Sequence, residues 1–268
     1  MMGASAIELD VARALSASLM AREMGLDPDD WQAEVMDSPE RRILMCCCRQ
    51  SGKSTTAAIV ATHAAVYESR SLVLLISPTM RQSGEVFQKC MAVYTGIGKP
   101  VASETETALS LRLENGSRII SLPGNASTVR GYSGVRLVVI DEAAWTDEDL
   151  PAALWPMLAV SGGRTVALST PNGKRGWFWE AWEQGGKSWR RFKVTADQVN
   201  RIPREYLTEE RARLGERDYR QEYLCEFLEK TGQAFSLASI DAAFDRGLQP
   251  LQLGEDPGPD INLDAKVS

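Results

Sequence analysis

The chain has 268 residues, 44% of them hydrophobic, and a formal net charge of −6. This length allows one large α/β domain with a small appendage, and is too short for two full domains of that size. The acidic balance argues against a surface coated with nucleic acid, so any contact with DNA must be confined to a local basic face. No stretch approaches the apolar length of a membrane span, and Glu8, Asp10 and Arg13 interrupt the N-terminus where a secretion signal would be apolar. We therefore expect a cytoplasmic protein without membrane contact.

Helical spacing of apolar residues marks the first segment, 6–24. The acidic run 27–30 then predicts the start of a further helix, just before Trp31 and Gln32.

A phosphate-binding loop follows. The apolar run 43–48 predicts a strand, and the stretch 55–67 predicts a helix. Between them Gly52 would let the backbone approach a phosphate, Lys53 would reach the β- and γ-phosphates, and Ser54 would offer a hydroxyl to magnesium. Cys47 replaces the usual first glycine, so a chance turn is the alternative. The predicted nucleotide contacts are Gln50, Ser51, Gly52, Lys53, Ser54 and Thr55.

Two carboxylates end a later apolar run. Residues 137–140 predict a buried parallel strand, and Asp141 and Glu142 follow it directly. Asp141 would hold magnesium through water, and Glu142 would activate the attacking water. The alternative is that both residues only cap a helix. With the loop upstream, the pattern predicts a nucleoside triphosphatase that uses ATP and Mg²⁺.

The surrounding pattern is that of an α/β sheet. Further strands are predicted over 72–76 and 165–169, a helix over 81–94, and a hairpin over 108–122 that turns at Asn115-Gly116. A turn over 170–173 ends the last strand. Because strands and helices alternate, the sheet should be mainly parallel.

From Arg175 to Leu228 the strand alternation fades, which predicts a small, mostly helical appendage. Its tryptophans lie among basic residues and could stack on nucleic acid, but we favour a core role, because a small subdomain needs large side chains. These tryptophans are Trp177, Trp179, Trp182 and Trp189. The arginines that follow alternate with acids and predict a solvated helix face. They are Arg201, Arg204, Arg211, Arg213, Arg217 and Arg220.

The cysteines and the only histidine are expected to be structural. Cys46, Cys47 and Cys48 are consecutive on a strand, so their side chains alternate between faces and cannot converge on one metal. We interpret them as small core residues, and His63 as a helix-packing residue.

Four segments together, 48–54, 129–132, 137–145 and 169–173, resemble the ATPase part of a bacteriophage terminase large subunit, the motor that packages DNA into procapsids. The resemblance covers about residues 31–227, and the loop without its first glycine is the form that this family uses. It implies a P-loop NTPase of the additional-strand catalytic-glutamate type, with a mainly parallel sheet flanked by helices and a small, mostly helical lid. It implies an ATPase core over 1–173, whose first 30 residues are helical, a lid over 174–230, and a linker or tail over 231–268 with no nuclease domain.

The resemblance also implies roles for single residues. Gln32 would contact adenine, Arg49 would lie near the γ-phosphate, and Arg130 would be an arginine finger presented to a neighbouring subunit. The coupling motif that senses hydrolysis would be Thr170, Pro171 and Asn172. Alternatives exist: Gln32 as an exposed helix residue, Arg130 as a surface cation, and Asn172 as a turn former.

The implied partners are double-stranded DNA, other copies of the chain in a ring, the portal and the terminase small subunit, all in an infected bacterial cell. Two other functions fit parts of the pattern. A helicase-like DNA-dependent ATPase would share Asp141 and Glu142, and a nucleotide-gated scaffold that does not hydrolyse ATP would keep Lys53 and Ser54 but not need Glu142 or Arg130.

Overall fold

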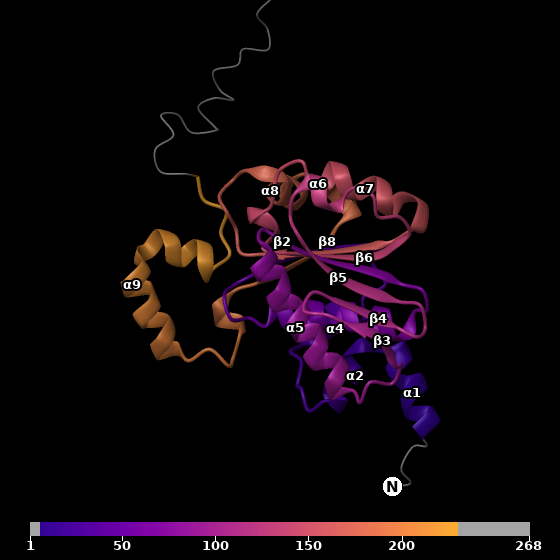
Figure 1. Cartoon of the computed structure of the whole chain (residues 1–268). Helices are drawn as coiled ribbons and strands as arrows, with labels where there is room; N and C mark the ends of the chain where they lie inside the picture. The colour runs from indigo at the N-terminus through magenta and orange to yellow at the C-terminus, as the bar shows by residue number, and fades with distance from the viewer. Residues whose placement is uncertain (1–5, 230–268) are drawn as a thin grey trace, which may run out of the picture. The chain divides into compact units, whose positions relative to one another are not determined.

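The centre of the structure, a computed structural model that describes residues 6–229, is an eight-stranded sheet in the order β3-β4-β5-β2-β6-β7-β1-β8 (Figure 1). The strands from β5 to β8 in this order run parallel, and β4 and β3 continue the sheet in antiparallel pairing beside β5. The strands are β1 (Arg42–Cys47), β2 (Leu72–Ser77), β3 (Ser103–Glu106), β4 (Ser110–Leu113), β5 (Arg118–Pro123), β6 (Val135–Asp141), β7 (Arg164–Ser169) and β8 (Arg190–Val194).

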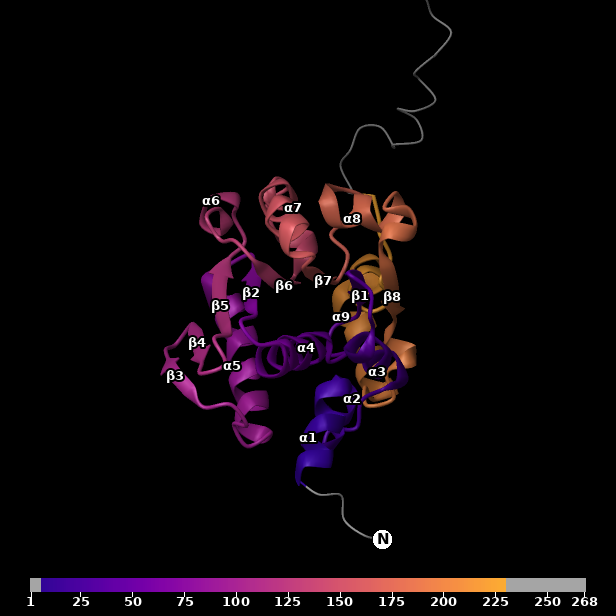
Figure 2. The ribbon, with the colours of Figure 1, turned by 90° about the vertical axis from the view of Figure 1, so that its right-hand side faces the viewer.

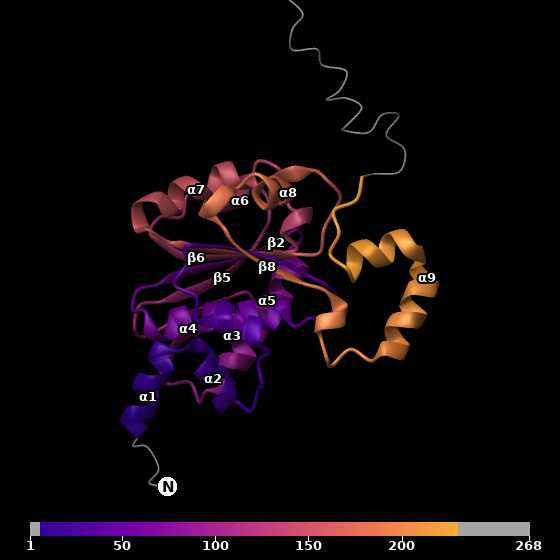
Figure 3. The ribbon, with the colours of Figure 1, turned by 180° about the vertical axis from the view of Figure 1, so that it is seen from behind.

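Helices cover both faces of this sheet (Figures 2 and 3). Strands that are covered on both faces read as continuous apolar runs, and β2 is buried at every position. On one face lie α1 (Ala6–Leu15), α2 (Ala17–Glu23), α3 (Asp30–Asp37), α4 (Lys53–Tyr67) and α5 (Met80–Gly96). On the other lie α6 (Ala126–Val129), α7 (Leu150–Ser161) and α8 (Gly176–Glu183). Short 3-10 turns are η1 (Ala143–Trp145), η2 (Gly186–Ser188) and η3 (Ala196–Gln198).

The strand order confirms the predicted fold class. β7 lies between β1, which leads into the phosphate loop, and β6, which ends at Asp141. This inserted strand is the additional strand that the resemblance implied. The parallel strands, the helix after the loop and the antiparallel hairpin are confirmed as well. The first helical segment is two helices instead of one, because Ser16 breaks it and its hydroxyl caps α2 by accepting from the Leu19 amide at 3.0 Å.

The tryptophan-rich segment differs from its prediction. β8 pairs in parallel with β1, so the first part of the segment expected to form the lid contains a strand of the main sheet. The rest of the segment is mostly helical, as predicted: α8 and η2 precede the strand, and η3 and α9 (Arg204–Glu222) follow it. α9 extends to the side of the sheet and is interrupted at Gly215, where φ is +79° (Figure 1).

A core role for the tryptophans is confirmed for the two most buried of them. Trp177 is 8% and Trp189 7% exposed, and the ring of Trp155 on α7 packs against both. The cysteines are buried and His63 packs against α1, with its Nε2 2.9 Å from the carbonyl of Arg13, as predicted. Among residues 6–229 no helix is long and apolar enough to cross a membrane. The predicted linker or tail, 231–268, lies outside the described residues.

Candidate active site

The phosphate loop joins β1 to α4 in a conformation that depends on glycine. Gln50 and Gly52 have positive φ values, +59° and +86°. A β-carbon at position 52 would lie 2.7 Å from Nε2 of Gln32, closer than real contacts allow. Gly52 is therefore favoured by its backbone angle, and a larger residue there would also displace the end of the Gln32 side chain.

The two carboxylates at the end of β6 face this loop. The hydroxyl of Ser54 donates to Oδ2 of Asp141 at 3.0 Å, and the amide of Glu142 donates to Oδ1 of the same carboxylate at 3.0 Å. The carboxyl ends of parallel strands meet at one edge of the sheet, which is why residues 87 positions apart come together.

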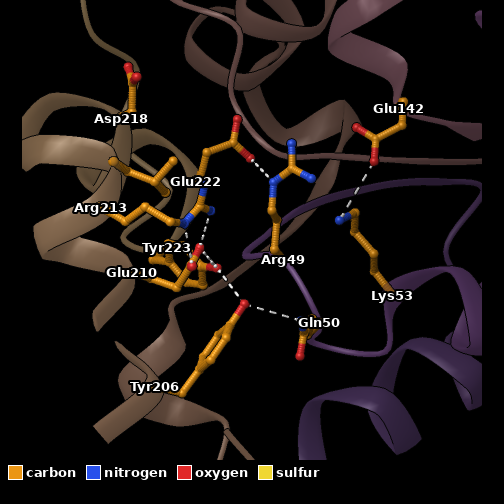
Figure 4. A pocket seen from close by; sticks show the side chains of 11 residues that line it. Arg49, Gln50, Lys53, Glu142, Tyr206, Glu210, Arg213, Asp218, Glu222 and Tyr223 are labelled. Atoms are coloured by element: carbon orange, nitrogen blue, oxygen red, sulfur yellow. Dashed lines mark hydrogen bonds and ion pairs between the residues drawn. The ribbon is translucent and has the colours of Figure 1, made fainter. Parts of the chain in front are cut away.

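Lys53 and Glu142 form the charged centre of the site. Nζ of Lys53 lies 3.8 Å from Oε1 of Glu142, and the two side chains point at each other (Figure 4). Only 9% of the lysine side chain and 31% of the glutamate side chain are exposed. Burial raises the pKa of Glu142, and the nearby ammonium of Lys53 opposes that rise. Glu142 also has a left-handed backbone, with φ +51°, a conformation that is uncommon for residues other than glycine.

An open pocket of about 570 Å³ extends from this centre to α9 (Figure 4). Arg49 lines this pocket, and its Nε pairs with Oε2 of Glu222 at 2.6 Å. Gln50 donates to the hydroxyl of Tyr206 at 3.4 Å. Thus Arg49, Gln50, Lys53 and Glu142, all predicted from the sequence, line one pocket, and α9 forms its opposite wall.

A second cavity of about 240 Å³ lies on the α3 side of the loop, lined by apolar side chains together with Gln32, Gly52 and Thr55. Gln32 is 7% exposed, so it is not the exposed helix residue of the alternative interpretation. Its Oε1 accepts from the amide of Asp29 at 2.9 Å, and its Nε2 donates to the carbonyl of Ser51 at 3.4 Å.

The predicted coupling turn touches the segment that follows Glu142. Asn172 donates from Nδ2 to the carbonyl of Ala144 at 3.1 Å, and the amide of Ala144 donates to the Ser169 hydroxyl at 3.2 Å. Thr170, which lies between Ser169 and Asn172 in the sequence, is buried. Asn172 in the turn and Ser169 at the end of β7 are therefore both hydrogen-bonded to Ala144, two residues after Glu142.

Arg130 lies apart from these groups. It is exposed at the C-terminal end of α6 and does not line the 570 Å³ pocket. Its predicted role stays a prediction.

Several residues near the site are not among those that the sequence predicts there, and three of them contact the phosphate loop. Tyr206 and Glu222 line the pocket from α9. Arg201 is predicted to lie on a solvated helix face, but it precedes α9, and its guanidinium donates to the carbonyl of Ser51 in the phosphate loop. The surrounding sequence gives no local signal for these contacts, because each is made by residues far apart in the chain.

The donors at the site suit magnesium. Ser54 and Asp141 offer a hydroxyl and a carboxylate, the hard oxygen ligands that Mg²⁺ prefers, and a P-loop site takes its other ligands from water and phosphates. In the described part of the chain no group of three or more His, Cys, Asp or Glu side chains could hold a metal without such help.

A parallel sheet with an additional strand, a glycine-dependent phosphate loop and paired carboxylates at its carboxyl edge defines the P-loop NTPase class. Residues 44–241 match the family model for the terminase large subunit, T4likevirus-type, N-terminal. The chain belongs to this terminase large subunit family.

Known relatives of the chain are terminase large subunits as well. The terminase large subunit of Thermus virus P23-45 is 26% identical in an alignment of 254 residues, and the match covers 80% of this chain and 51% of that protein. The chain thus spans about half the length of the curated relatives it matches. The large terminase ATPase domain of Thermus phage P74-26 is 25% identical with a TM-score of 0.67, and the match covers 78% of this chain and 97% of that one. The large terminase of a thermophilic bacteriophage, in complex with ATP-gamma-S, has a TM-score of 0.62 at 13% identity, over 74% of this chain and 52% of that one.

Proposed function

We propose that this chain binds Mg-ATP at the carboxyl edge of the sheet and hydrolyses it, as the ATPase of a motor that moves double-stranded viral DNA into procapsids. The observation that carries the proposal is the meeting of the loop and the carboxylates: Lys53 lies 3.8 Å from Glu142, and Ser54 lies 3.0 Å from Asp141.

Each of these four residues has a separate task in the proposal. Lys53 holds the β- and γ-phosphates, and Ser54 and Asp141 hold the magnesium ion, which neutralises charge on the phosphates. Glu142 orients a water molecule and takes its proton. The raised pKa of Glu142 makes the carboxylate a stronger base than an exposed one, and the positive charge of Lys53 keeps it ionised.

The relatives support ATP as the nucleotide. The large terminase of the thermophilic bacteriophage has been solved with ADP and with ATP-gamma-S, and the P74-26 relative is named an ATPase domain. The 240 Å³ cavity beside Thr55 combines apolar side chains with a few polar groups, the amide of Gln32 among them, a lining that suits a base. We place the adenine there, against Gln32.

The proposal extends to the assembly. Arg130 is exposed and outside the pocket of its own chain, which supports a role as a finger that reaches the site of a neighbouring copy in a ring. Thr170, Pro171 and Asn172 would pass the loss of the γ-phosphate from the catalytic edge to the DNA. Contacts to DNA would be to its phosphates, because a packaging motor must accept any sequence. The portal and the small subunit are proposed as partners on family grounds.

The test is the ATPase rate as a function of protein concentration, with and without duplex DNA. We expect the rate per chain to rise steeply with concentration, since each site needs a neighbour, and to rise further with DNA. Glu142→Gln should bind Mg-ATP nearly as well as the wild type while turnover collapses, because the amide keeps the shape and cannot take the proton. Normal turnover by Glu142→Gln would favour the scaffold that does not hydrolyse ATP.

The role of Arg130 has its own test. Arg130→Ala should bind ATP without hydrolysing it, because a finger from a neighbour can contribute about 10³–10⁵ in rate. Lys53→Ala has a dead site but still carries its Arg130. Mixing the two inactive variants should restore part of the activity. If subunit exchange is shown independently and the mixture stays inactive, Arg130 does not act on a neighbour.

A further inference from the structure

The carbonyl of Ser51, inside the phosphate loop, accepts hydrogen bonds from two side chains at once. Nε2 of Gln32 on α3 lies 3.4 Å from it, and Nη2 of Arg201 contacts it from the segment before α9. Asp29 joins the two donors: its amide donates to Oε1 of Gln32 at 2.9 Å, and its Oδ2 pairs with Nη1 of Arg201 at 2.8 Å. Gln32 and Arg201, which are 169 positions apart in sequence, thus bind the same carbonyl, that of Ser51.

The position of Arg201 is fixed by its neighbours. Val199 and Ile202 are 1% and 6% exposed, and the amide of Ile202 donates to the carbonyl of Val199 at 3.0 Å. The backbone on both sides of Arg201 is therefore anchored in the core. Its guanidinium also borders the 240 Å³ cavity, and it would lie 3.1 Å from a β-carbon at Gly52. The Arg201 side chain is 42% exposed, so it reaches the Ser51 carbonyl from the surface beside this cavity.

The peptide that is held in this way belongs to the loop that would bind phosphate. A trans peptide directs its N–H opposite to its C=O. Holding the Ser51 carbonyl against Gln32 and Arg201 therefore turns the Gly52 amide away from α3. An amide that is already oriented loses less freedom when an anion binds, so a fixed loop binds phosphate more tightly than a loose one.

We propose that Arg201 is a positioning residue for the phosphate loop: together with Gln32 it clamps the Ser51 carbonyl and so presents the Gly52 amide to the bound phosphates. The inference rests on the proposed function, because it needs a polyphosphate at this loop. Arg201 acts through the Ser51–Gly52 peptide and not by contact with the base.

The test compares MgATP, MgADP and magnesium tripolyphosphate, which has phosphates but no base. Arg201→Met should weaken the binding of all three by a similar factor, about tenfold, the effect expected from losing a hydrogen bond to a charged donor. Arg201→Lys keeps the charge but not the planar pair of donors, and should lie between Arg201→Met and the wild type. Arg204→Met is the matched control: Arg204 is exposed on the first turn of α9, and we expect wild-type binding from it.

The other outcomes are distinct. Loss of ATP and ADP binding with tripolyphosphate binding unchanged would show that Arg201 contacts the base, and would overturn the clamp. Wild-type binding of all three by Arg201→Met would overturn it as well. If Arg201→Met does not fold, Arg201→Lys decides between the same outcomes by the same comparison. A wild-type chain that binds none of the three would refute the proposed function itself.

Discussion

Trp177 offers the sharpest test of how the segment after β7 is built. Its ring is 8% exposed and packs edge-to-face on Trp155 and Phe178, with centroids 6.2 and 6.0 Å away. Its Nε1 donates to Oγ1 of Thr146 at 3.0 Å, which joins α8 to the turn that follows Glu142. Replacing a buried tryptophan by alanine costs about 3–5 kcal/mol. For a domain of this size that free energy corresponds to a loss of roughly 6–20 °C in Tm.

The assay is thermal unfolding of Trp177→Ala beside two further variants. Trp177→Phe keeps most of the ring packing and removes the hydrogen bond, so it should cost about 1–2 kcal/mol. Trp145 is 49% exposed, and Trp145→Ala should cost only about 2 kcal/mol, since about half of the tryptophan surface is already in contact with water. If Trp177→Ala unfolds at the same temperature as Trp145→Ala, the core role argued for Trp177 is wrong. Unchanged stability with reduced DNA affinity would point to stacking on nucleic acid instead.

Three further results are expected at the active site. Lys53→Ala should abolish hydrolysis and weaken ATP binding in a filter or calorimetric assay, because the phosphates lose their fixed positive partner; wild-type turnover would place the phosphate site elsewhere. Asp141→Asn should raise the magnesium concentration needed for half-maximal rate, and an unchanged requirement would remove Asp141 from the metal site. The pH profile of kcat/KM, which reports the free enzyme, should fall on the acid side with a midpoint above 4.5, the ordinary value for a glutamate, because burial raises the pKa of Glu142 and only its ionised form can take a proton. A midpoint of kcat/KM at or below 4.5 would contradict that assignment.

The parts of the site that could be predicted are those with a local sequence signal. Gly52, Lys53 and Ser54 lie between a strand and a helix, and Asp141 and Glu142 end another strand. Parallel strands bring their carboxyl ends to one edge, so the sequence alone predicts that the two groups meet. The structure adds the distances and the left-handed backbone of Glu142, which no pattern of residue types encodes.

The sequence does not predict the strand β8, because this strand lies at an edge of the sheet. It reads Arg190-Arg191-Phe192-Lys193-Val194, and only Phe192 and Val194 are buried. An edge strand has a partner on one side and exposes alternate residues, so it lacks the continuous apolar run that marks β2 or β6. Without such a run β8 gives no strand signal, and because the strand alternation fades from Arg175 onward, the pattern predicts a mostly helical appendage here.

The contacts of α9 could not be predicted for a different reason. Arg201, Tyr206 and Glu222 reach the phosphate loop over more than 140 residues of sequence, and nothing near them in the chain distinguishes them from their exposed neighbours. The ion pair Arg211–Glu216 on the same helix fits the predicted solvated face, whereas Arg213 and Glu210 pair with each other in the lining of the 570 Å³ pocket. Sequence patterns separate buried from exposed faces, but they do not identify which exposed charge has a distant partner.

The position of β8 also bears on how the proposed motor would work. The amide of Cys48 donates to the carbonyl of Val194 at 2.9 Å, and the amide of Arg49 donates to the carbonyl of Glu222 at 3.1 Å. The first two residues of the phosphate loop are thus bonded to both ends of the segment that contains η3 and α9. A lid joined at one end could pivot independently of the loop, whereas a segment held at both ends must follow it. If the loop moves when phosphate leaves, these two hydrogen bonds would pass the movement to both ends of the segment that contains α9.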